Sequence, residues 1–165
     1  GTHTPHWVIG PHPKTPCLNR TIGNSTPTEY FNTHGIQTQY RPQILETLQS
    51  KLIINASLNA LGAHYKYTHH MLMTEHAHTL KAICFESTHI LNQAGFKPTP
   101  AMLWDQVKAL IHTCGNNKNS MLQDIESKKK TEIQSINGYL VDLAHQHNVP
   151  CPLNQMLCQH IEAMI

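Results

Sequence analysis

The feature that most constrains this chain is the helical spacing of its apolar residues, which begins near residue 41 and continues to the end of the sequence. Leu, Ile, Val and Ala recur three and four positions apart, as they do on the buried face of an amphipathic helix. Thr99 followed by Pro100 is typical of a helix start, and Gly95 and Gly115 are typical of positions just past a helix end. The pattern predicts helices over residues 42–63, 71–94, 99–115, 120–128, 131–147 and 153–165. We therefore expect an all-helical domain over residues 41–165.

Residues 1–40 have a different composition, in which proline and glycine recur too closely for long helices to form. Short β-like runs remain at residues 6–9 and 35–40, and Thr26 followed by Pro27 predicts a short helix near residues 27–33. This stretch is too small and too polar to bury a core of its own. We interpret it as the last part of an α/β domain, so the fold class is mainly α with a short α/β segment in front.

Composition excludes several classes of protein. Charged residues are only 13% of the 165 residues and the net charge is +2, which gives no strong electrostatic attraction to nucleic acid or to a membrane surface. No apolar run approaches the roughly 18 residues of a membrane-spanning helix, and no signal-peptide pattern is found. The five cysteines are widely spaced and include no C-x-x-C pair, which favours a reducing, cytoplasmic location.

Fourteen histidines raise the question of a metal site. His76 and His78, like His145 and His147, are two positions apart, so they would point about 200° apart on a helix. A zinc site needs four ligands in a suitable geometry. We therefore expect no metal ion, and we interpret the histidines as exposed replacements for Lys and Glu.

A narrow polar stripe runs along the first predicted long helix. Lys51, Asn55 and Asn59 are spaced four residues apart, so they share one helix face, and Leu, Ile and Ala occupy most of the positions around them. Buried amides and a buried ammonium are costly unless they find partners. A bound polar ligand explains such a stripe, but an ordinary solvated face explains it as well.

A second polar group follows at residues 117–132. Ser120 and Asp124 are four residues apart and share one helix face. Ser120 and Thr131 also fit helix N-caps, and Glu132 in a first helical turn is favoured by the helix dipole. Spacing alone therefore leaves ligand binding and helix capping open.

Together these segments resemble the C-terminal domain of the ketopantoate reductase (2-dehydropantoate 2-reductase) family. The similarity is carried by the K-x-x-x-N-x-x-x-N pattern at 51–59, Glu86, Ser-Met-x-x-Asp at 120–124, Thr-Glu-Ile at 131–133 and Asn-Gly at 137–138. It implies that residues 41–165 form a helical substrate and dimerisation domain, similar to that of 6-phosphogluconate dehydrogenase. It also implies that residues 1–40 are a remnant of an NADP-binding Rossmann domain.

The resemblance implies an NADP-dependent oxidoreductase of pantothenate biosynthesis, which reduces a 2-oxo acid, ketopantoate, to pantoate. Lys51 would act as the general acid and Glu132 would hold the substrate's hydroxyl, so these two are the expected catalytic residues. The residues expected to bind substrate are Asn55, Asn59, Asn117, Ser120 and Asp124.

The expected partners follow from the same resemblance. No G-x-G-x-x-G occurs in the sequence, so we expect this chain alone to bind no cofactor and NADPH to be held by a Rossmann domain in cis. A 2-oxo acid and a second copy of the chain are the other expected partners. The stretch Tyr-Thr-His-His at 67–70 departs from the family's Asn-Gly-type turn and leaves the choice of 2-oxo acid open. The alternative is a non-catalytic helical module for dimerisation or partner binding.

Overall fold

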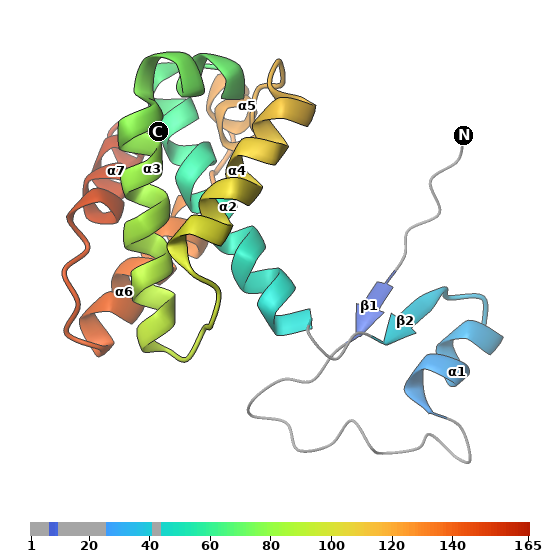
Figure 1. The fold of residues 1–165 in the computed structure, drawn as a ribbon. Helices are drawn as coiled ribbons and strands as arrows, with labels where there is room; N and C mark the ends of the chain where they lie inside the picture. The colour runs from blue at the N-terminus through green and yellow to red at the C-terminus, as the bar shows by residue number, and fades with distance from the viewer. Residues whose placement is uncertain (1–6, 10–25, 41–43) are drawn as a thin grey trace. The chain divides into compact units, whose positions relative to one another are not determined.

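A computed structural model describes residues 7–9, 26–40 and 44–165 (Figure 1). The chain divides into two compact units between Leu48 and Gln49. In the first unit, strand β1 (Trp7–Ile9) pairs in parallel with strand β2 (Thr38–Tyr40), and helix α1 (Pro27–Thr33) lies between them in the sequence. Both strands lie within the predicted β-like runs, although the predicted start at residue 6 is outside the described residues.

Helix α1 begins as the sequence predicts. The Thr26 hydroxyl accepts a hydrogen bond from the Glu29 backbone N, and the Glu29 carboxylate accepts one from the Thr26 backbone N at 2.8 Å. This reciprocal capping box satisfies two donors that a helix start leaves free. The Asn32 side chain then accepts from the Thr38 backbone N, so the helix end is tied to β2.

The remaining elements are helical, which confirms the prediction of a mainly α chain. They are α2 (Ile44–Tyr65), α3 (His69–Gln93), α4 (Pro100–Cys114), α5 (Ser120–Glu126), the π-helical turn η1 (Gln134–Gly138), α6 (Tyr139–Gln146) and α7 (Pro152–Glu162). Each predicted helical segment is present, and its ends differ by a few residues. The predicted start of the first long helix at residue 42 lies outside the described residues.

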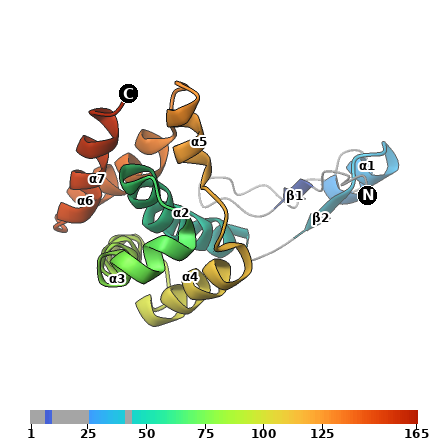
Figure 2. The same ribbon diagram turned by 90° about the horizontal axis from the view of Figure 1, so that it is seen from above.

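The second half of helix α2 lies in the middle of the helical unit (Figures 1 and 2). Every residue from Ala56 to Ala63 is buried. A helix that is buried all round has no polar face, which explains why charged residues are absent from this part of the sequence. Helices α3, α6 and α7 pack on one another through leucine and isoleucine side chains and complete the core.

Three local predictions need correction. The N-cap of α5 is Asn119 and not Ser120, because the Asn119 side chain accepts the hydrogen bond from Leu122 N at 2.9 Å. Thr131 is not an N-cap either, because its hydroxyl is buried without a hydrogen bond in the described part of the chain. Helix α3 is kinked at His76, where φ is −132° and ψ is 27°, whereas the sequence predicts one continuous helix.

Helix α4 offers a simple test of the capping argument. The Thr99 hydroxyl accepts a hydrogen bond from Met102 N, as predicted, so we expect Thr99→Ala to destabilise the protein by about 1 kcal/mol and to lower Tm by roughly 2–4 °C. Thr113→Ala is the control, because the Thr113 hydroxyl only donates to the Ala109 carbonyl within the same helix. Equal Tm values for the two variants in thermal unfolding would contradict this role of Thr99.

The N-terminus of α7 is capped by a side chain from α3. The Glu86 carboxylate accepts hydrogen bonds from the backbone N of Leu153 at 3.1 Å and of Asn154 at 2.9 Å, and from Asn154 Nδ2 at 2.8 Å. Cys151, at the N-cap position, makes no side-chain cap bond. A carboxylate is favoured here because the first N–H groups of a helix lack partners and carry partial positive charge. Glu86 therefore anchors α7 to α3.

Candidate functional site

The polar stripe of α2 runs from the surface into the interior. Lys51 is exposed, Asn55 is half-buried and Asn59 is only 8% exposed. Of the two interpretations that spacing leaves open, the solvated one therefore holds for Lys51 and the buried one for Asn59, since the helix enters the core only after Lys51. None of the three side chains forms a hydrogen bond or ion pair with another residue in the described ranges.

Asn59 is the most informative residue of the stripe. An amide that is this buried costs about 1–3 kcal/mol when its hydrogen bonds are not made. Its side-chain oxygen and nitrogen are nevertheless not fully enclosed, because each keeps some accessible surface. The Asn59 amide is thus largely buried but keeps some accessible surface, so a small polar ligand at this end of the stripe would find a hydrogen-bonding group there.

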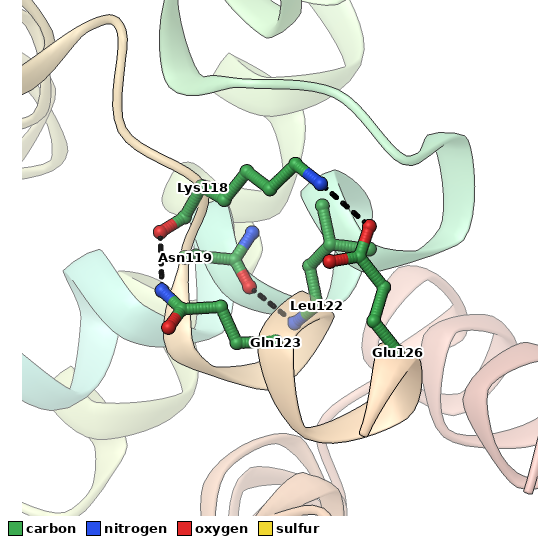
Figure 3. Close-up of polar contacts among 5 residues, drawn as sticks. All are labelled: Lys118, Asn119, Leu122, Gln123 and Glu126. Atoms are coloured by element: carbon green, nitrogen blue, oxygen red, sulfur yellow. Dashed lines mark hydrogen bonds and ion pairs between the residues drawn. The ribbon is translucent and has the colours of Figure 1, made fainter. Parts of the chain in front are cut away.

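The loop before α5 packs on the same helix. A Cβ atom added to Gly62 would lie 2.4 Å from Asn119 Nδ2, so this glycine permits the close approach. Figure 3 shows how the start of α5 is held: Asn119 caps it, Lys118 pairs with Glu126 at 2.7 Å, and Gln123 Nε2 donates to the Lys118 carbonyl.

This arrangement leaves the predicted residues of the segment available. Because Asn119 is the cap, the hydroxyl of Ser120 is not used for capping and the side chain is exposed. Asp124 lies one turn further on and is half-buried, and Asn117 is exposed in the loop. Among the described residues, neither Ser120 nor Asp124 has a side-chain hydrogen bond or ion pair.

Glu132 lies at the start of the turn that leads into η1. Its carbonyl accepts hydrogen bonds from the backbone N of Ser135 and Ile136, both at 3.0 Å, while its carboxylate is exposed and forms no ion pair with a described residue. The same turn reaches α2, because Asn137 Nδ2 donates to the Ala56 carbonyl at 3.1 Å. The structure therefore packs the segments that carry Ser120 and Glu132 against α2, although no hydrogen bond joins the predicted residues to one another.

An open pocket of about 810 Å³ lies between the start of α3 and the end of α4. Its polar and basic lining includes His70, Lys108 and His112. The sequence singled out neither Lys108 nor His112, and His70 only as part of the stretch at 67–70. Of the seven predicted site residues, Asn117 alone lines it. No periodicity could have revealed this pocket, because it depends on a contact between two helix ends that are far apart in the sequence.

Mostly buried thiols and the absence of a metal-ligand cluster characterise the described cysteines and histidines. Burial raises the pKa of Cys84 to about 11 and of Cys158 to about 11, so these thiols stay protonated at neutral pH. No group of three or more His, Cys, Asp or Glu side chains is placed to hold a metal ion in the described ranges. In the same ranges, no helix combines the length and apolarity that crossing a membrane requires.

Two histidines are expected to make stability depend on pH. Burial lowers the pKa of His69, whose two ring nitrogens are enclosed without a hydrogen-bond partner among the described residues. Burial also lowers the pKa of His64, and so do the charges of His160, whose ring stacks on it at 4.5 Å, and of His76. A histidine whose folded pKa is lowered stabilises the fold above its unfolded pKa of about 6.5, and that stability is lost as the pH falls through the folded pKa.

We therefore expect the free energy of unfolding to fall as the pH drops below about 6.5. Urea titrations at a series of pH values would measure this, and His64→Gln should flatten the curve. His89→Gln is the control, because His89 is exposed on α3. A wild-type stability that stays constant between neutral and mildly acidic pH would exclude this role for His64 and His69.

Comparison with known proteins identifies the helical part of the chain. Residues 43–164 match the family model described as "Ketopantoate reductase PanE/ApbA C terminal". The 2-dehydropantoate 2-reductase of Vibrio cholerae is 29% identical over 137 residues, which are 82% of this chain and 46% of that protein. The chain therefore spans about half the length of the curated relatives it matches.

Solved structures have the same fold. The PanE/ApbA family ketopantoate reductase from Ralstonia eutropha superposes with a TM-score of 0.79 at 21% identity, over 96% of this chain and 51% of that one. A D-mandelate dehydrogenase with NADH and anilino(oxo)acetate superposes with a TM-score of 0.73 at 18% identity, over 83% of this chain and 58% of that one. At these identities the likeness concerns the fold alone, and the family follows from the match over residues 43–164. The chain belongs to the ketopantoate reductase family and contains its C-terminal domain.

Proposed function

We propose that this chain provides the substrate-binding domain of an NADPH-dependent 2-dehydropantoate 2-reductase, which reduces the 2-oxo group of ketopantoate to a hydroxyl. The family match supports this reaction class. The observation that carries the proposal is the Asn59 amide, which is buried at the inner end of a polar stripe and has no hydrogen bond to a described residue. A small acid with several polar groups would supply the missing partners.

Each predicted side chain has a chemical task. Reduction develops negative charge on the carbonyl oxygen of the substrate, and the Lys51 ammonium stabilises that charge and donates the proton that completes the hydroxyl. The Glu132 carboxylate accepts a hydrogen bond from the substrate's own hydroxyl. Asn55 and Asn59 orient the reacting carbon, and the Ser120 hydroxyl donates to the substrate carboxylate. Asn117 and Asp124 complete the lining.

The residues of this chain do not fit a dinucleotide site, because the sequence has no G-x-G-x-x-G turn. We therefore assign NADPH, which supplies the hydride when bound, to a Rossmann domain in cis. The parallel pairing of β1 with β2 across α1 supports this, since such a crossover is the building unit of that fold. A second copy of the chain and a cytoplasmic location complete the proposal.

The test joins this chain to the part of the Vibrio cholerae relative that it does not match and measures NADPH oxidation with ketopantoate. Turnover that depends on ketopantoate would support the proposal. Other 2-oxo acids, including anilino(oxo)acetate, should be tried in parallel, because residues 67–70 leave the preferred acid open. A folded chimera that binds NADPH but reduces none of these acids would favour the alternative of a non-catalytic helical module.

A further inference from the structure

A network of buried polar side chains joins four elements of the helical unit. Asn137 of η1, Asn154 of α7 and Ser87 of α3 are all fully buried. Asn154 Nδ2 donates to Glu86 at 2.8 Å and to Ser87 Oγ at 3.2 Å, and its Oδ1 accepts from Asn137 at 3.0 Å. The network thus runs from α3 through α7 to η1.

The side-chain amide nitrogen of Asn137 extends this network to α2. Its Nδ2 donates both to Asn154 Oδ1 and to the Ala56 carbonyl, at 3.0 and 3.1 Å. Its Oδ1 is enclosed and has no partner among the described residues. An enclosed oxygen without a partner opposes stability. Packing of the core alone therefore does not explain an amide at this position. Its two directional hydrogen bonds fix the orientation of α2 and α7 relative to η1.

The two ends of this link lie within the proposed substrate site. Ala56 follows Asn55 directly and precedes Asn59 by one helical turn. On the other side, Asn137 belongs to the turn that begins at Glu132, whose carbonyl accepts hydrogen bonds from the backbone N of Ser135 and Ile136. The π-helical winding of η1 widens this turn, and Ile136, Asn137 and Gly138 are consecutively buried in it.

We propose that Asn137 is a positioning residue, whose amide fixes the α2 turn carrying Asn55 and Asn59 against the segment that begins at Glu132. This inference rests on the proposed function, because it assigns Asn137 a task in that same site. Asn137 itself does not touch the substrate. It acts through the Ala56 carbonyl, so its loss should change the geometry of the site as well as the stability of the fold.

The test compares Asn137→Ala with Ser87→Ala in the 165-residue chain. The Ser87 hydroxyl forms hydrogen bonds with the Asn154 side chain, so its loss weakens the same network but keeps the hydrogen bond between Asn137 and the Ala56 carbonyl. Two readouts are needed. One is the pair of side-chain amide resonances of Asn55 and Asn59 in NMR spectra without ligand, and the other is the Kd for ketopantoate. Asn137→Ser, whose hydroxyl is too short to reach Ala56, gives the same comparison if the alanine variant does not fold.

We expect Asn137→Ala to shift both amide resonances and to weaken ketopantoate binding by roughly 10-fold to 100-fold. Ser87→Ala should lower the unfolding midpoint while leaving the resonances unchanged and the Kd within about twofold of wild type. Wild-type resonances in Asn137→Ala, or equal losses of affinity in the two variants, would overturn the positioning role. If the wild-type chain binds no ketopantoate, the proposed function is in error, and the amide resonances still decide whether Asn137 sets this face of α2.

Discussion

Lys51→Ala is expected to lower kcat for ketopantoate by about 10²-fold to 10⁴-fold in the chimera that carries an NADPH-binding domain. Lys51 is the one charged side chain of the α2 stripe, and it lies at the exposed end of that stripe. Without the ammonium, the oxygen that gains charge during reduction has neither a counter-charge nor a proton donor from this helix. Steady-state kinetics at saturating ketopantoate would measure the loss.

Lys118→Ala is the matched control for this prediction. Lys118 is also an exposed lysine near the proposed site, but its ammonium forms an ion pair with the Glu126 carboxylate at 2.7 Å. Such surface ion pairs contribute little, so we expect the control to keep kcat within about twofold and to change stability by less than about 1 kcal/mol. A Lys51→Ala variant that turns over as fast as Lys118→Ala would remove Lys51 from the chemistry.

Glu86→Ala is expected to lower the free energy of unfolding by about 3 kcal/mol. The variant loses a carboxylate that accepts three hydrogen bonds at the start of α7, two of them from backbone N–H groups that have no other cap. Hydrogen bonds to a charged acceptor are stronger than neutral ones, and part-buried donors left without a partner add to the loss. Urea unfolding followed by circular dichroism would measure it.

Glu75→Ala controls for the removal of a glutamate from the same helix. Glu75 is exposed on α3, and surface substitutions of this kind change stability by about 0.5 kcal/mol or less. Glu86→Gln removes the charge but keeps the shape of the side chain. We expect its free energy of unfolding to lie between those of the wild type and Glu86→Ala. If Glu86→Ala unfolds at the same urea concentration as Glu75→Ala, the anchoring of α7 by Glu86 is not significant for stability.

Much of the fold could be predicted because helix signals are local. Thr26 with Pro27 and Thr99 with Pro100 mark helix starts, and the structure confirms both caps. Gly95 follows α3 with φ of +93°, a conformation that suits glycine at a helix end. Such signals depend on a few neighbouring residues, so a single sequence is sufficient to find them.

The features that sequence could not supply depend on distant contacts. Asn137 meets Ala56 across 81 positions, and Glu86 meets Asn154 across 68. These contacts decide how α2 is buried and where α7 begins, and no local pattern contains them. The same limit explains why the burial of Lys51 stayed open, because the stripe shows which residues share a face but not where along the helix the core begins.

For another reason, the sequence could not decide whether Ser120 caps α5. Asn119 and Ser120 are adjacent and both residue types cap helices well, so the sequence allows either register. The structure selects Asn119, and this leaves the Ser120 hydroxyl free for the role that the family resemblance implies. The correction therefore removes the capping alternative for Ser120 and supports, without testing, its proposed role in binding.

Whether the stripe on α2 binds the 2-oxo acid is decided by an NMR titration of the 165-residue chain with ketopantoate. We predict that the side-chain amides of Asn55 and Asn59 shift first, together with the backbone amides of Ser120 and Glu132. Shifts confined to the open pocket lined by His70 and Lys108 would contradict this placement of the site.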